Sequence, residues 1–197
     1  MVRVVQNLVG RPTIGICGYS GPMASSGDMD LVAEARRNWV ERGFGEIEAM
    51  VSVTSLARSH QIVLGRINQA LSPMSLTFSR FEALALLSFA RKNSMAMARL
   101  GERLQVHPTS VTSTIDRLER DGLVERSPHP DDRRATLVTL TGDGKKLAEK
   151  ATTALEEIRW GMGDLPDAKL ADLNDSLADV RASAGDNVEG SKRTSRS

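Results

Sequence analysis

The chain has 197 residues, of which 26% are charged and 40% hydrophobic, and its formal net charge is +1. No apolar run approaches the ~18 residues that a membrane-spanning helix needs, so the composition excludes an integral membrane protein and predicts one folded domain with extensions. The single cysteine, Cys17, excludes an internal disulfide framework. Because the N-terminal residues also lack the pattern of a secretion signal, we expect a cytoplasmic protein.

Charge is unevenly distributed along the chain. Residues 91–134 carry nine basic and seven acidic side chains, whereas residues 147–190 carry four basic and ten acidic side chains. A basic middle followed by an acidic C-terminal arm suits a protein that presents one surface to phosphate. The basic excess is small, however, so charge alone does not establish nucleic-acid binding.

The first part of the chain predicts a leader followed by helices. Residues 1–28 are rich in glycine and have no periodicity, which predicts a disordered leader. A short helix is expected at residues 31–42. A long amphipathic helix is expected at residues 53–72, where apolar residues recur at spacings of three and four. Residues 79–90 predict a further helix that is apolar on nearly all sides and therefore belongs to the core.

The middle of the chain predicts two helices and a hairpin. Residues 94–104 predict a helix, and another begins at Pro108 and stops at Gly122. Two strands are expected at residues 123–126 and 136–140, where β-branched side chains are frequent. The segment between them is rich in proline and aspartate, which predicts an exposed loop. A helix, a turn, a helix and a hairpin in this order form a winged helix-turn-helix.

The last part of the chain predicts two helices and a polar tail. One helix starts after Thr141 and carries an apolar stripe as far as Ile158. The next is opened by Pro166, and its apolar residues follow a three-four-three spacing that predicts packing against a partner helix. These residues are Leu170, Leu173, Leu177 and Val180. Residues 185–197 predict a disordered tail.

The helix at residues 108–120 has a face suited to DNA. A major groove about 12 Å wide admits one α-helix, and short Thr and Ser side chains let its backbone approach phosphates and base edges. Arg117 has the planar fork that can bind guanine O6 and N7. Arginines on the neighbouring hairpin can reach the narrow minor groove, where negative potential is concentrated.

Three stretches of sequence carry a resemblance to a known family. They are LTFSRFEAL at residues 76–84, LQVHPTSVTSTIDRLERDGLVER at 104–126, and DDRRATLVTLT at 131–141. These stretches resemble the MarR family of transcription regulators, and the resemblance runs over roughly residues 53–158. It implies a fold that is mainly α with a small β-hairpin wing, a winged helix-turn-helix with N- and C-terminal dimerisation helices.

The resemblance also implies a function and an organisation. A MarR-type domain is expected at residues 29–184, with a DNA-reading part at about 94–141 and dimerisation helices at about 31–72 and 143–184. The implied function is transcription regulation, more often repression, by a homodimer on a pseudo-palindromic site in double-stranded DNA. A small effector, aromatic or amphipathic, is expected in a crevice between the dimerisation and reading parts.

Matched residue by residue, the resemblance implies DNA contacts on the second helix of the motif and on the wing. They are Pro108, Thr109, Ser110, Thr112, Ser113 and Arg117 on the helix, and Arg126, Arg133 and Arg134 on the wing. Asp132 matches a wing aspartate that pairs with arginine, so it is expected to organise the wing. The alternatives are that Arg117 and Arg120 form solvated ion pairs, and that Thr109 and Ser110 only satisfy the start of the helix.

An effector pocket is expected around His60, Arg80 and Phe81, with Trp39 and Trp160 at its border, and packing in the core and dimer is the alternative role for these residues.

The three histidines lie in separate elements without a companion cysteine, so we expect no metal site and no cofactor. No nucleophile, base or metal constellation predicts an enzyme. The alternative to a DNA-binding regulator is a winged helix that serves only as a protein-interaction module.

Overall fold

The computed structural model describes residues 30–130, 132, 134–186 and 188. The predicted leader at 1–28, Arg133 and most of the predicted tail therefore lie outside the described residues. The chain divides into two compact units, with the boundary between Val51 and Ser52. Within the described residues, no helix is long and apolar enough to cross a membrane.

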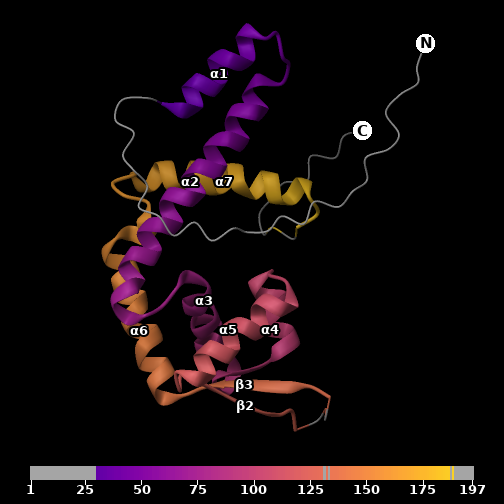
Figure 1. The fold of residues 1–197 in the computed structure, drawn as a ribbon, viewed down its shortest axis with the longest axis vertical. Helices are drawn as coiled ribbons and strands as arrows, with labels where there is room; N and C mark the ends of the chain where they lie inside the picture. The colour runs from indigo at the N-terminus through magenta and orange to yellow at the C-terminus, as the bar shows by residue number, and fades with distance from the viewer. Residues whose placement is uncertain (1–29, 131, 133, 187, 189–197) are drawn as a thin grey trace, which may run out of the picture. The chain divides into compact units, whose positions relative to one another are not determined.

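The first unit contains α1 (Leu31–Glu41) and the beginning of α2 (Ile47–Leu71) (Figure 1). Asp30 caps α1, because its carboxylate accepts hydrogen bonds from the backbone N–H groups of Val32 and Ala33 at 3.0 and 3.1 Å. These donors have no partner inside the helix, so the aspartate stabilises its first turn. The predicted short helix is confirmed.

The turn between α1 and α2 is held by side chains of both helices. The rings of Trp39 and Phe44 pack edge to face with centroids 4.9 Å apart, and the Trp39 indole N–H donates to the carbonyl of Gly45 at 3.0 Å. Arg36 and Glu48 form an exposed ion pair at 2.5 Å. Hydrogen bonding and the charge of this guanidinium lower the pKa of Glu48 from its usual value.

Helix α2 begins earlier than the sequence predicted. The prediction placed its start at residue 53, where the apolar periodicity becomes clear, whereas the helix begins at Ile47. The residue before it, Glu46, has a φ of +53°, which ends the preceding turn and lets the helix start there. Ile47, Met50 and Val51 already follow the spacing of three and four, so the same periodicity could have shown these first turns.

The second unit contains the remaining helices, and each was predicted within a few residues of its ends. They are α3 (Phe78–Phe89), α4 (Met97–Leu104), α5 (Pro108–Arg120), α6 (Gly142–Glu157) and α7 (Asp167–Ser183). Single helical turns lie at η1 (Ser72–Met74), η2 (Arg91–Asn93) and η3 (Arg159–Gly161).

Three antiparallel strands, β1 (Ser94–Ala96), β2 (Val124–Pro128) and β3 (Thr136–Leu140), form a sheet in the order β1-β3-β2. The hairpin of β2 and β3 was predicted, but β1 was not. The prediction of a helix from residue 94 was wrong for its first three residues, which pair with Leu137–Thr139 of β3. Pairing supplies their backbone groups with partners, and a strand this short has no periodicity of its own.

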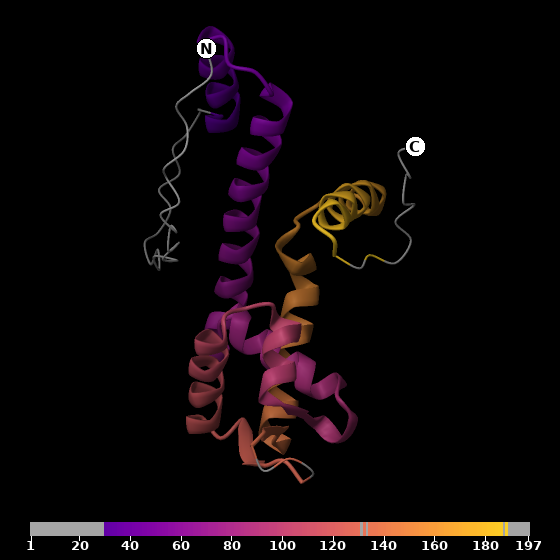
Figure 2. The ribbon, with the colours of Figure 1, turned by 90° about the vertical axis from the view of Figure 1, so that its right-hand side faces the viewer.

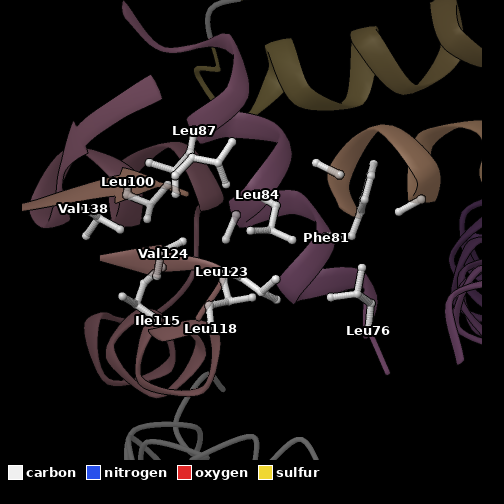
Figure 3. Close-up of a cluster of buried hydrophobic side chains, with 14 of the residues drawn as sticks. Leu76, Phe81, Leu84, Leu87, Leu100, Ile115, Leu118, Leu123, Val124 and Val138 are labelled. Carbon is white, nitrogen blue, oxygen red and sulfur yellow. The ribbon is translucent and has the colours of Figure 1, made fainter. Parts of the chain in front are cut away.

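Helices α3, α4 and α5 and the three strands share one hydrophobic core, and we call this part of the second unit the winged-helix region. Figure 3 shows side chains from all three helices and from β2 and β3 pointing toward one another. Those fully or almost fully buried include Leu84, Leu87, Leu100, Ile115, Leu118, Val124 and Val138. The buried face of α5 is the predicted one, so its other face is turned outward.

In Figure 2, α6 rises from the hairpin, and the residue before it is bonded to the turn that follows α5. The Thr141 hydroxyl donates to the carbonyl of Gly122 at 2.9 Å, and the Thr141 N–H donates to the carbonyl of Leu123 at 3.1 Å. The same hydroxyl accepts from the N–H of Gly144 at 3.0 Å and caps α6. A Cβ atom on Gly144 would collide with the Leu123 carbonyl oxygen, so this close approach requires glycine.

Candidate nucleic-acid interface

The start of α5 is capped by His107. Its Nδ1 accepts a hydrogen bond from the Thr109 N–H at 3.3 Å and lies 3.1 Å from the Thr109 hydroxyl oxygen. Pro108 takes the first helical position, where its missing N–H has no cost. The sequence prediction considered Thr109 and Ser110 for capping and missed His107. A polar side chain directly before a helix-opening proline is the signal that could have found it.

The outward face of α5 carries six of the predicted DNA contacts, and all six are exposed: Pro108, Thr109, Ser110, Thr112, Ser113 and Arg117. The Thr112 hydroxyl donates to the carbonyl of Pro108 at 3.1 Å. Among the residues that the structure describes, nothing hydrogen-bonds or pairs with the side chains of Ser110, Ser113 and Arg117. This face therefore presents short hydroxyls and one guanidinium that are available for a ligand.

A polar groove of about 380 Å³ runs between α5 and the start of α3. Its lining residues are Thr77, which caps α3, Ser79 and Arg80 of α3, and Thr109, Ser110, Ser113, Thr114 and Arg117 of α5. Hydroxyl and guanidinium groups are the side-chain donors that bind phosphate oxygens. On the α5 side, Thr109, Ser110, Ser113 and Arg117 were among the predicted contacts, whereas Thr114 was not. Thr77 and Ser79 were not predicted, because only the packing of α3 beside α5 brings them there.

Arg80 joins the start of α3 to the end of α5. Its Nη1 donates to the carbonyl of Ser75 at 2.7 Å, and its Nη2 forms an ion pair with Asp121, the residue that ends α5. Only 12% of the Arg80 side chain is exposed. The guanidinium predicted to border an effector crevice is thus engaged between two elements of the winged-helix region.

Arg126 of β2 lies against α5. Its Nη1 is 2.6 Å from a carboxylate oxygen of Asp116 and 3.0 Å from one of Glu119, and 23% of its side chain is exposed. Its Nη2 donates to the carbonyl of Thr112 at 3.4 Å. The sequence prediction made Arg126 a wing contact to DNA and did not foresee these ion pairs, because they depend on how β2 packs on α5.

The described part of the wing loop is closed by Asp132. Its carboxylate accepts from the Arg134 N–H at 2.9 Å, and its carbonyl accepts from the Ala135 N–H at 3.0 Å. The Arg134 side chain is exposed and has no ion pair with another described residue. Asp132 thus bonds the backbone of the wing, while the Arg134 guanidinium faces solvent.

The three predicted effector residues do not share a pocket. A mostly apolar pocket of about 290 Å³ is lined by Arg66, Gln69, Ala70, Ile158, Gly161 and Gly163. Arg80 lines the polar groove instead, and His60 and Phe81 line neither. His60 is exposed on α2, whereas Phe81 is buried in the core and packs edge to face on Trp160 at 5.8 Å between centroids.

Among the residues that the structure describes, no cluster of three or more His, Cys, Asp or Glu side chains could hold a metal ion.

Comparison with known proteins gives one consistent result. The sequence model of the MarR family matches residues 76–136. An uncharacterized HTH-type transcriptional regulator from Mycobacterium bovis is 36% identical over 115 residues, which cover 58% of this chain and 73% of that protein.

Two solved structures place the fold in the same family. Sco5413, a MarR family transcriptional regulator from Streptomyces coelicolor, is 40% identical with a TM-score of 0.66, over 71% of this chain and 99% of that one. A mutant MarR from Escherichia coli, solved in complex with operator DNA, is 27% identical with a TM-score of 0.62, over 68% and 95% of the two chains. This chain therefore belongs to the MarR family of transcriptional regulators.

Proposed function

We propose that this protein binds a pseudo-palindromic operator in double-stranded DNA as a homodimer and represses transcription. The observation that carries the proposal is the outward face of α5, where hydroxyl side chains and Arg117 stand opposite a fully buried apolar face. A helix with one face fixed in a core and the other made of short polar groups and a guanidinium matches what the major groove admits. The MarR relative solved with operator DNA supports the same use of the fold.

Each part of the interface has a role in this proposal. Arg117 reaches base edges in the major groove, and the hydroxyl side chains of α5 contact the backbone. The polar groove between α5 and α3 receives phosphates, which adds Thr77 and Ser79 to the proposed contacts. Arg134, together with Arg133, inserts at the minor groove beside the wing. Asp132 holds the wing turn in place for them.

The homodimer is supported by apolar side chains that the single chain leaves exposed. On α2, Val53 is 68% exposed, and on α7, Val180 is 60% exposed and Leu173 is also exposed. No residue of α7 is buried. Exposed apolar rows of this kind mark surfaces that another chain covers. A second copy is the partner that a two-fold operator site requires, because each copy then supplies one α5.

A small aromatic or amphipathic effector that releases the DNA completes the proposal. The apolar pocket between α2 and η3 supports it, since Arg66 gives that pocket one cationic group. Its guanidinium donates to the carbonyl of Gly161 at 2.8 Å, which fixes it at the rim. We place the effector in this pocket rather than among His60, Arg80 and Phe81.

Selection of bound sequences from a random DNA pool identifies the operator, and two variants then test the interface. Arg117→Ala and Arg134→Ala are each expected to weaken operator binding by about tenfold or more and to flatten the salt dependence by about one unit of slope, because each loses a guanidinium contact to DNA. Lys150→Ala, an exposed cation on α6, is the matched control and should change neither quantity.

Unchanged affinity and salt slope in both arginine variants would contradict the proposed contacts. A pool with no enriched sequence, together with a tight protein partner in pull-down experiments, would favour the protein-interaction module instead. These outcomes separate the two functions because only DNA binding depends on counterion release.

A further inference from the structure

The recognition helix carries two carboxylates as well as its DNA-facing groups. Asp116 and Glu119 lie three residues apart on α5, on either side of Arg117 in sequence, and both are partly exposed. Negative charges on a helix that enters the major groove are costly, because they face the phosphates of two strands. A helix used in this way needs a means of cancelling them.

One guanidinium satisfies both carboxylates. Nη1 of Arg126 contacts Asp116 at 2.6 Å and Glu119 at 3.0 Å, while Nη2 donates to the carbonyl of Thr112. The side chain therefore spans two turns of α5 from a position on β2. The planar fork of arginine allows this geometry, whereas a lysine ammonium has no comparable arrangement of donors.

The position of Arg126 is set by the sheet. Its backbone pairs with Val138 of β3, a fully buried residue, so the base of the side chain is fixed by the core. Its Nε is buried, and no described residue accepts from it. With every hydrogen-bonding nitrogen turned toward α5 or into the packed interior, Arg126 differs from Arg134, whose side chain is exposed.

We propose that Arg126 is a positioning residue for DNA recognition and does not contact DNA itself. It neutralises Asp116 and Glu119, so that Arg117 and the hydroxyl groups meet DNA without two opposing charges. The inference rests on the proposed DNA binding and assigns part of its affinity to a residue that does not touch DNA. Without Arg126 the cluster of three side chains would keep both negative charges and lose its only positive one.

A double-mutant cycle tests the proposal on the full chain. Operator affinity is measured by fluorescence anisotropy for the parent, Arg126→Gln, Asp116→Asn with Glu119→Gln, and the combination of all three. Arg126→Gln should weaken binding by about tenfold or more, because it leaves two carboxylates facing phosphate. The carboxylate variant and the combined variant should each bind within about threefold of the parent, since neither holds an uncompensated carboxylate.

Arg134→Gln combined with the same two carboxylate substitutions is the matched control. It should stay as weak as Arg134→Gln alone, because Arg134 has no contact with Asp116 or Glu119. Equal recovery in the Arg126 and Arg134 backgrounds would reduce the effect to general electrostatics and overturn the positioning role.

A combined variant that stays as weak as Arg126→Gln would show that Arg126 binds phosphate directly, and would also overturn the proposal. Thermal unfolding of each variant separates binding from folding. If Arg126→Gln alone fails to fold, the combined variant still decides, because it leaves no unpaired charge behind. A parent protein that binds no selected DNA would refute the proposed function rather than this inference.

Discussion

The winged-helix region and helix α7 differ in the burial of their apolar side chains. In the winged-helix region, leucine, isoleucine and valine side chains of α3, α4, α5 and the sheet are fully buried within one chain. Helix α7 is longer than any of those helices, yet no residue of it is buried, and Leu173 and Val180 are exposed. The first region is a core that one chain completes, whereas the second carries an apolar row that one chain leaves uncovered.

The largest expected effect comes from truncating the core of the winged-helix region. Leu118→Ala should lower the free energy of unfolding by about 2–5 kcal/mol, because it removes buried methyl groups and leaves a cavity. Leu173→Ala in α7 is the matched control and should cost less than about 1 kcal/mol, because its side chain is already partly in solvent. Denaturant unfolding at a protein concentration low enough to keep the chain monomeric measures both, because a dimer would cover Leu173 at the proposed seam. Equal losses would abolish the contrast between the regions.

The second effect concerns association rather than folding. Leu173→Glu with Val180→Glu should raise the dissociation constant of the dimer by about 100-fold, equivalent to about 2.7 kcal/mol, because charges would replace apolar side chains at the proposed seam. Sedimentation equilibrium measures the constant, and circular dichroism checks that the helices remain. If self-association does not change, the apolar row of α7 is not the dimer interface.

A third effect tests the joint between α5 and α6. Gly144→Ala should cost about 1–3 kcal/mol of stability, because its Cβ would meet the Leu123 carbonyl and force the backbone to move. Gly142→Ala, in the same turn, has open space at the corresponding position and should change stability by no more than about 0.5 kcal/mol. Thermal unfolding distinguishes them. A neutral Gly144→Ala would show that the two helices can separate without cost.

The smallest effect lies in the first unit. Its one complete helix, α1, resembles α7 in having no buried residue. Arg36→Gln should return the pKa of Glu48 to its usual range, because the guanidinium is the cause of its lowering. A carboxyl with a lowered folded pKa contributes stability above its unfolded pKa and loses it as pH falls through the folded one. An NMR titration of the Glu48 carboxyl measures the change. An unaltered titration would show that the ion pair does not hold this turn.

Much of the winged-helix region follows from sequence alone. The spacing of Val111, Ile115 and Leu118 predicts both faces of α5, and Pro108 and Gly122 predict its ends because one has no N–H and the other accepts a positive φ. These are local rules, so a single sequence expresses them fully. The exposed polar side chains of α5 follow from the same local rules, because residues that do not belong to the core face of the helix must lie on its other face.

The features that sequence could not show depend on contacts between elements distant along the chain. Strand β1 is defined by its pairing with β3, not by any pattern in its three residues. The sequence does not distinguish Arg126 from the other arginines of the wing. Only the packing of β2 on α5 places it against Asp116 and Glu119. Thr77 joins the polar groove for the same reason. A residue whose role depends on the packing of two elements can be identified only from the tertiary structure.

Thr141 has a mechanical consequence. Because it bonds the carbonyls of Gly122 and Leu123 while it caps α6, it ties the turn that follows α5 to the first turn of α6. A tilt of α6 would therefore displace the residues that end α5. Two copies of α5 that bind successive major grooves must stand about 34 Å apart. In the proposed dimer on DNA, a tilt of α6 would therefore change that separation.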